Sequence, residues 1–169
     1  SDLITETQWA TIRSWQNINL NRVNSSEAKS SSLEGIQYFT GLTVLDCAGN
    51  QLSTLDLSTL TKLTQLDCGR NRLTSLDVSQ NTQLKILACG ENAISSLDLR
   101  NNSALESIVC YSNSLGSLLL GEKPTLTSLI CYDNRLKALD LSAAPKLEIL
   151  LCSDNQLTSL DLSTNTALK

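Results

Sequence analysis

The amino-acid sequence repeats itself every 21 residues. An asparagine recurs at this spacing six times, and a cysteine stands three residues before each asparagine. No insertion or deletion interrupts the series. A fixed period of this length is typical of a solenoid, in which each repeat packs only against its neighbours. The members are Asn50, Asn71, Asn92, Asn113, Asn134 and Asn155, with Cys47, Cys68, Cys89, Cys110, Cys131 and Cys152.

The pattern inside one repeat predicts its local structure. The unit that begins at Leu63, LTQLDCGRNRLTSLDVSQNTQ, follows the consensus LxxLxCxxNxLxxLDLxxNxx. Apolar residues at positions 1, 4 and 6 alternate with polar ones as in a short strand, and LDL at positions 14 to 16 alternates again. We therefore expect a mainly β or α/β repeat solenoid, with a parallel sheet on the concave wall and short extended segments on the convex wall. The asparagine amide at position 9 is expected to bond the backbone of its own turn and of the neighbouring turn.

This unit resembles the leucine-rich repeat. The cysteine at position 6 and the LDL segment are similar to a bacterial class with the same 21-residue consensus, and LEGIQYFTGLTVL from Leu33 resembles the repeats that open surface proteins related to the internalins. The resemblance covers Leu33 to the end, about four fifths of the chain. It implies a domain that binds a protein or a glycan, in a bacterial protein that is secreted or held at the cell surface.

The period divides the chain into three parts. Residues 1–41 break the period and predict an N-terminal cap with a short helix, an irregular strand and a polar loop from Asn24. Residues 42–167 hold six complete repeats, and residues 168–169 begin a truncated seventh. Because a parallel edge without a cap invites pairing with another chain, we expect a longer parent protein or a homodimer through the C-terminal end.

Composition limits the function classes. The chain has no histidine, so it lacks an imidazole base and histidine ligands for a metal. A net charge of −4 without a basic stripe argues against nucleic acid. No apolar run reaches the length of a membrane span, and the first residues lack the pattern of a signal peptide. With no nucleophile beside a base and no phosphate loop, we predict no enzymatic activity, no metal and no cofactor.

Two ladders of reactive side chains have more than one interpretation. The cysteines occupy the slot that leucine fills in related repeats, which favours a reduced, buried ladder over disulfides or a metal site. The second ladder consists of aspartates in the LDL segments. We expect each to bond the turn that follows it, with Ca²⁺ binding as the alternative. The aspartates are Asp56, Asp77, Asp98, Asp140 and Asp161.

Positions 3, 5 and 7 point away from the core on the sheet wall, and their character changes along the chain. The residues at positions 5 and 7 are acidic or small in the first repeats and mostly apolar or aromatic in the last ones. Tyrosine is common in binding hot spots, and clustered apolar residues mark interaction sites. The alternative is that β-branched residues simply favour strands and that a second copy or further repeats cover the patch, as in a structural spacer or self-associating element. The candidate ligand-binding residues are Val109, Tyr111, Ile130, Tyr132, Ile149 and Leu151.

Overall fold

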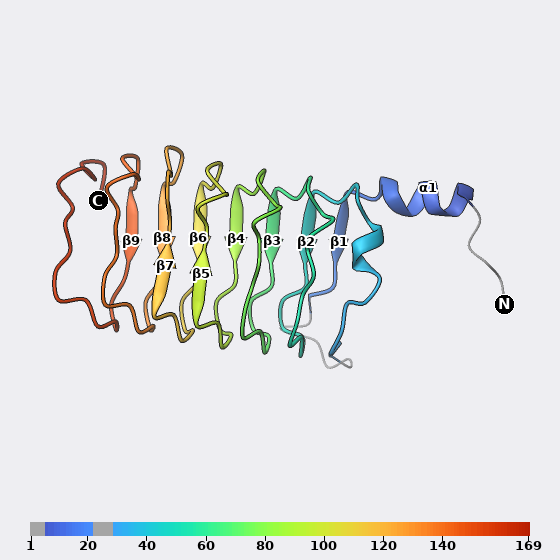
Figure 1. Ribbon diagram of the computed structural model, residues 1–169, viewed down its shortest axis with the longest axis horizontal. Helices are drawn as coiled ribbons and strands as arrows, with labels where there is room; N and C mark the ends of the chain where they lie inside the picture. Colours follow the sequence, from blue (N-terminus) through green and yellow to red (C-terminus); the bar gives the residue numbers. More distant parts are fainter. Residues whose placement is uncertain (1–5, 22–28) are drawn as a thin grey trace.

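The computed structural model describes residues 6–21 and 29–169, which form a solenoid with parallel strands stacked along one axis (Figure 1). Helix α1 (Glu6–Ser14) and strand β1 (Asn17–Asn19) come first, followed by a 3₁₀ turn at Ile36–Tyr38. The concave wall is a seven-stranded parallel sheet in the order β1-β2-β3-β4-β6-β8-β9, and β5 (Ser96–Asp98) pairs with β7 (Ser117–Leu119) on the opposite, convex wall. The predicted repeat fold is confirmed. The remaining strands are β2 (Val44–Asp46), β3 (Gln65–Asp67), β4 (Ile86–Ala88), β6 (Ser107–Val109), β8 (Ser128–Ile130) and β9 (Ile149–Leu151).

The strands pair in a register that equals the sequence period. Leu45 pairs with Leu66, Leu66 with Leu87, and Leu129 with Leu150, so each repeat position stacks on the same position of the next repeat. Strand spacing in such a sheet is about 4.8 Å. Any residue type that recurs at one position therefore becomes a continuous row along the solenoid.

The buried rows are those expected from the consensus. The leucines at position 1 have no solvent exposure in any repeat, and positions 4, 6, 11 and 16 are buried through most of the array. Leu129 and Cys131 lie in this core, while Ile130 between them is half-buried on the outer side of the sheet. The alternation expected for a strand is thus present.

The N-terminal segment continues the sheet by one strand. Strand β1 pairs with β2, and the Trp15 ring packs against Phe39 with 5.6 Å between centroids. Helix α1 extends beyond β1 (Figure 1), and its last turn lies so close to Gly41 that any side chain there would collide with the Arg13 carbonyl. The loop expected from Asn24 lies largely outside the described residues.

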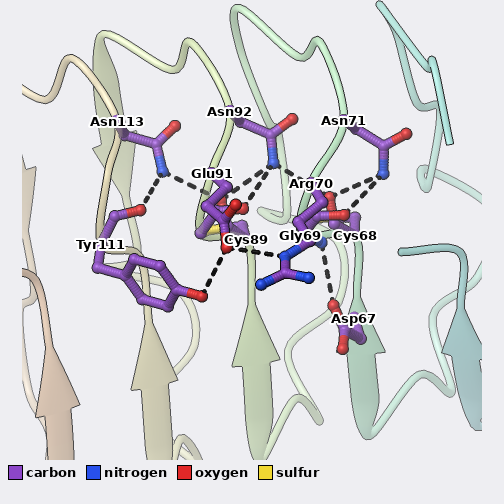
Figure 2. A network of polar contacts seen from close by, with 11 residues as sticks. Asp67, Cys68, Gly69, Arg70, Asn71, Cys89, Glu91, Asn92, Tyr111 and Asn113 are labelled. Atoms are coloured by element: carbon purple, nitrogen blue, oxygen red, sulfur yellow. Dashed lines mark hydrogen bonds and ion pairs between the residues drawn. The ribbon is translucent and has the colours of Figure 1, made fainter. Parts of the chain in front are cut away.

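An asparagine ladder joins the turns after the sheet (Figure 2). The Asn92 amide nitrogen donates to the carbonyls of Cys89, Gly90 and, in the preceding repeat, Cys68, at 3.1 to 3.3 Å. Its Oδ1 accepts the Leu73 N–H at 3.0 Å. Asn71, Asn113, Asn134 and Asn155 repeat this pattern. Each amide thus satisfies buried backbone groups in two repeats, as expected.

The cysteines form a second row directly beside the asparagine turns. All six are free thiols, and all except the half-buried Cys152 are buried. Burial raises the pKa of Cys47, Cys89 and Cys131 to about 12. The thiolate is the reactive form of cysteine, so these thiols are shielded both sterically and electrostatically at neutral pH.

Position 19 carries a buried lysine in one repeat. At this position Asn102 donates to the carbonyls of Val78 and Asn81, each at 2.9 Å, whereas its Oδ1 finds no partner among the described residues. Lys123 replaces it one repeat on, is fully buried, and donates through Nζ to the carbonyls of Leu99 and Leu120. Lysine is a donor only, so it pairs these carbonyls without burying an idle acceptor. Burial lowers the pKa of Lys123 to about 8.

Replacing Asn92 by alanine is expected to lower the free energy of unfolding by about 3 kcal/mol, because the lost amide leaves buried backbone groups in two repeats unpaired. Urea unfolding followed by circular dichroism measures this change. The exposed Asn101→Ala is the matched control and is expected to change stability by less than about 0.5 kcal/mol. Equal effects of the two substitutions would contradict the structural role of the ladder.

Native protein at pH 8 is expected to react with a thiol reagent fastest at Cys152, because Cys152 is only half-buried whereas the other five cysteines are buried. After unfolding without reductant, all six thiols are expected to react. Cys152→Ala should remove the rapid phase. A titre below six in the unfolded chain would indicate disulfides and contradict the reduced ladder.

Lys123→Asn should reveal a pH-dependent difference in stability. Because the folded pKa lies near 8 and the unfolded pKa near 10.4, the unfolded chain binds more protons between these values. Wild type should therefore gain about 2 kcal/mol of stability relative to the variant between about pH 7 and pH 9.5. Comparing the two proteins at each pH cancels the contribution of the cysteines. A difference that does not change with pH would show that folded Lys123 keeps the pKa of the unfolded chain and stays charged throughout this range.

Candidate binding surface

The concave face is the outer side of the seven-stranded sheet, formed by repeat positions 3, 5 and 7. Register places Ala88 beside Val109, Val109 beside Ile130, and Ile130 beside Leu151. We call Val109, Ile130 and Leu151 the apolar row. The row crosses β6, β8 and β9 without interruption, so the three side chains share one surface.

Ile149 extends the apolar row on its C-terminal strand. It stands two residues before Leu151 and therefore on the same side of β9. Ile149 is 50% exposed and Leu151 49% exposed, while Val109 and Ile130 are half-buried. The sequence did not single out Ile86, which is 39% exposed on β4 but is separated from Ile149 by Ser107 and Ser128 in the same row.

Two tyrosines stack beside the apolar row. The rings of Tyr111 and Tyr132 lie 4.8 Å apart between centroids and are inclined by only 10°. Tyr111 covers Gly90, because a Cβ on that glycine would lie 3.0 to 3.2 Å from three atoms of the ring. Gly90 is therefore buried although its position faces outward. Because Gly90 has no side chain, the Tyr111 ring can lie directly over it.

Figure 2 shows how the first ring is fixed. The Tyr111 hydroxyl donates to Glu91 Oε1 at 3.0 Å, and Arg70 Nε donates to the same oxygen at 2.8 Å. The hydrogen bond from Arg70 lowers the pKa of Glu91, whereas burial raises the pKa of Tyr111. Sequence reasoning missed this network. The signal was available, since Arg70 and Glu91 both stand at position 8 in successive repeats and Tyr111 at position 7 of the next.

The N-terminal half of the concave face carries small or acidic residues at positions 5 and 7. A shallow hollow of about 210 Å³ lies between Asp67, Gly69, Ala88 and Tyr111. Small residues, among them Gly69 and Ala88, line the hollow together with Tyr111. Asp67 accepts the Gly69 N–H at 3.0 Å, and burial raises the pKa of its carboxyl group. The concave face thus changes from a small, acidic surface to an apolar, aromatic one.

The aspartate ladder of the convex wall serves the turns. Asp56, Asp77 and Asp140 each accept the backbone N–H two residues later at 2.9 to 3.0 Å, as predicted. These bonds lower the pKa of Asp56 and Asp77. Within residues 6–21 and 29–169, no group of three His, Cys, Asp or Glu side chains is arranged to hold a metal ion. Nor does the described part of the chain contain a helix long and apolar enough to cross a membrane.

Comparison with known proteins agrees with this architecture. Residues 40–81 match the family model described as leucine-rich repeats in two copies. No curated protein matches the chain significantly. Among solved structures, the functional domain of InlJ from Listeria monocytogenes, which includes a cysteine ladder, is 30% identical with a TM-score of 0.53; the match covers 95% of this chain and 44% of that one.

Two further structures share the fold at lower identity. A leucine-rich repeat protein from Leptospira interrogans is 24% identical with a TM-score of 0.80, over 96% of this chain and 44% of that chain. The internalin InlF from Listeria monocytogenes is 20% identical with a TM-score of 0.77, over 98% and 49%. The chain therefore spans less than half the length of each of these proteins.

Repeat, register and family match agree on the fold. The chain folds as a leucine-rich-repeat solenoid, its residues 40–81 match the leucine-rich repeat model, and it is similar to the functional domain of InlJ from Listeria monocytogenes, which likewise includes a cysteine ladder.

Proposed function

We propose that the chain binds a protein ligand through the C-terminal half of its concave face, with Val109, Tyr111, Ile130, Tyr132, Ile149 and Leu151 as the contact residues. The continuous apolar row with two half-exposed residues on β9 carries this proposal. Single exposed apolar residues are ordinary on protein surfaces, but contiguous ones mark interaction sites.

The geometry of the concave face also indicates that side chains, rather than backbone groups, would contact the ligand. The backbone groups within the seven-stranded sheet are already bonded between repeats, so specificity on its face has to come from side chains. Tyr111 is held in place by stacking and by Glu91, so little conformational entropy is lost when it is covered. A rigid aromatic surface beside an aliphatic row suits a protein ligand better than a glycan.

The proposal also covers the catalytic activity, the cellular location and the domain division of the protein. Leucine-rich repeat domains are typically non-enzymatic scaffolds for protein interaction, and we propose that this chain has no catalytic activity of its own. Similarity to the internalins supports a bacterial protein that is secreted or held at the cell surface. The proposal keeps the division indicated by the sequence, with a cap at 1–41, six repeats at 42–167 and the start of a further repeat at 168–169.

Self-association is the second candidate, because β9 pairs only with β8 among the described strands and carries two of the exposed apolar residues. A homodimer at this end would cover Ile149 and Leu151 and leave the chain as a structural element. Solution mass separates the two candidates, since a dimer that depends on the apolar row must dissociate when the row receives a charge.

The test is Ile130→Asp, compared with Leu119→Asp on the convex wall. Both residues end a short strand and are at least partly exposed, and Leu119 stands where most other repeats have aspartate. We expect wild type and both variants to be monomers by light scattering. Proteins captured from an extracellular extract should be retained by wild type and Leu119→Asp and lost with Ile130→Asp.

Two results would contradict the proposal. A wild-type dimer that Ile130→Asp converts to a monomer would assign the row to self-association. Capture that is unchanged in Ile130→Asp would place ligand binding elsewhere on the molecule.

A further inference from the structure

The tyrosine stack has a direction. Tyr111 leans toward the preceding repeat, since its ring lies over Gly90 and its hydroxyl reaches Glu91. Tyr132 stacks on it nearly parallel, at one strand spacing, and therefore leans the same way. One face of the Tyr132 ring is covered by Tyr111. Its other face turns toward Ser153, the exposed residue at the same position of the next repeat.

The tyrosine stack ends at Tyr132 because the next residue at the same repeat position, Ser153, has no ring. The turns of these repeats continue in register, with the Asp133 N–H donating to the Ser153 carbonyl at 3.1 Å and Asn134 N–H to the Asp154 carbonyl at 3.0 Å. A third planar group could therefore occupy the next step of the stack. Serine is too short to do so. We call the surface formed by Tyr132, Asp133, Leu151, Ser153 and Asp154 the open end of the stack.

The repeat itself indicates what the tip of such a group would meet. A ring that lies over one repeat points its tip at position 8 of that repeat, as Tyr111 over Gly90 points at Glu91. A group stacked on the outer face of Tyr132 lies one step beyond the Tyr132 ring, over the repeat that contains Asp133. Position 8 of that repeat is Asp133, and position 8 of the next is Asp154.

These two carboxylates differ from Glu91 in having no side-chain partner among the described residues. Neither forms an ion pair or accepts a side-chain hydrogen bond from any residue in 6–21 or 29–169, including the nearby Arg135. Glu91, by contrast, accepts a guanidinium hydrogen bond from Arg70 at the edge of the Tyr111 ring. The chain thus already contains, two repeats away, the pairing of tyrosine, carboxylate and arginine that the open end lacks.

We propose that the open end of the stack receives an arginine side chain of the protein partner. Its guanidinium would stack on Tyr132 and donate to Asp133, with Asp154 adding negative charge and Leu151 packing against the aliphatic part. A planar cation suits this place better than lysine, because only guanidinium both stacks on a ring and donates in a fork to a carboxylate. A neutral ring would leave both carboxylates uncompensated. This inference rests on the proposed function and names one chemical group of its ligand.

The probes are three capped tripeptides, Ac-Gly-Arg-Gly-NH₂ and its lysine and tyrosine counterparts, titrated into the ¹⁵N-labelled whole chain at low ionic strength. We expect saturable amide shifts at Asp133 and Ser153 with the arginine peptide, and an affinity at least about threefold higher than that of the lysine peptide. Equal affinity for lysine, or tighter binding of the tyrosine peptide, would overturn the assignment of arginine.

Three variants locate the binding. Ser153→Tyr supplies the third ring from the chain itself and is expected to abolish the shifts. Tyr132→Leu keeps an apolar side chain without an aromatic face and should weaken binding about threefold, and Asp133→Asn should weaken it by a similar factor. Glu34→Gln, an exposed carboxylate near the N-terminal end, is the matched control and should leave the affinity unchanged.

The two proposals fail in different ways. If Ile130→Asp abolishes capture of a partner but the arginine peptide produces no saturable shift, the binding face stands and the arginine assignment is wrong. If the peptide binds as described but capture is unaffected by Ile130→Asp, the proposed function fails while the open end remains an arginine site. Peptide binding that is unchanged in both Ser153→Tyr and Tyr132→Leu would overturn the inference.

Discussion

The structure depends on register between identical turns. Parallel strands of three residues are too short to hold a sheet together by themselves. The asparagine amides supply the missing constraint, because each one pairs carbonyls of two successive repeats and accepts an N–H from the earlier of the two. A slip by one residue would leave these groups buried and unpaired. The ladder therefore stabilises the turn and at the same time fixes which residues become neighbours.

Because the register is fixed, buried and outward-facing repeat positions have different roles. Buried positions can carry only residues that fit the repeat, so leucine and cysteine recur with little variation. Outward positions have no such requirement, and their side chains are free to differ from one repeat to the next. The change from Asp46 and Asp67 to Ile130 and Leu151 along one row shows this freedom. A regular core thus presents an irregular surface, which is what recognition of one particular partner needs.

Polar groups inside the coil follow the same physical rule. Backbone carbonyls at position 16 turn inward and need donors, and the side chain at position 19 of the next repeat, asparagine or Lys123, provides one. The lysine avoids an unpaired acceptor but carries a charge into a buried place, which is why its pKa falls. The cysteines avoid both problems, since a buried thiol has little need of a partner.

The sequence by itself determined the solenoid, the buried rows and the role of each position-9 asparagine, because a gapless 21-residue period leaves no other way to bury the repeated leucines. It also indicated that Ile130 and Tyr132 face outward, since alternation in a strand is a local property. Tertiary structure decided how outward residues meet. Gly90 lies under Tyr111, and Glu91 joins Arg70 to the tyrosine hydroxyl, because these contacts run between repeats and depend on side-chain rotamers. The direction of the tyrosine stack, and hence its open face at Ser153, follows from those rotamers and could not be obtained from spacing alone.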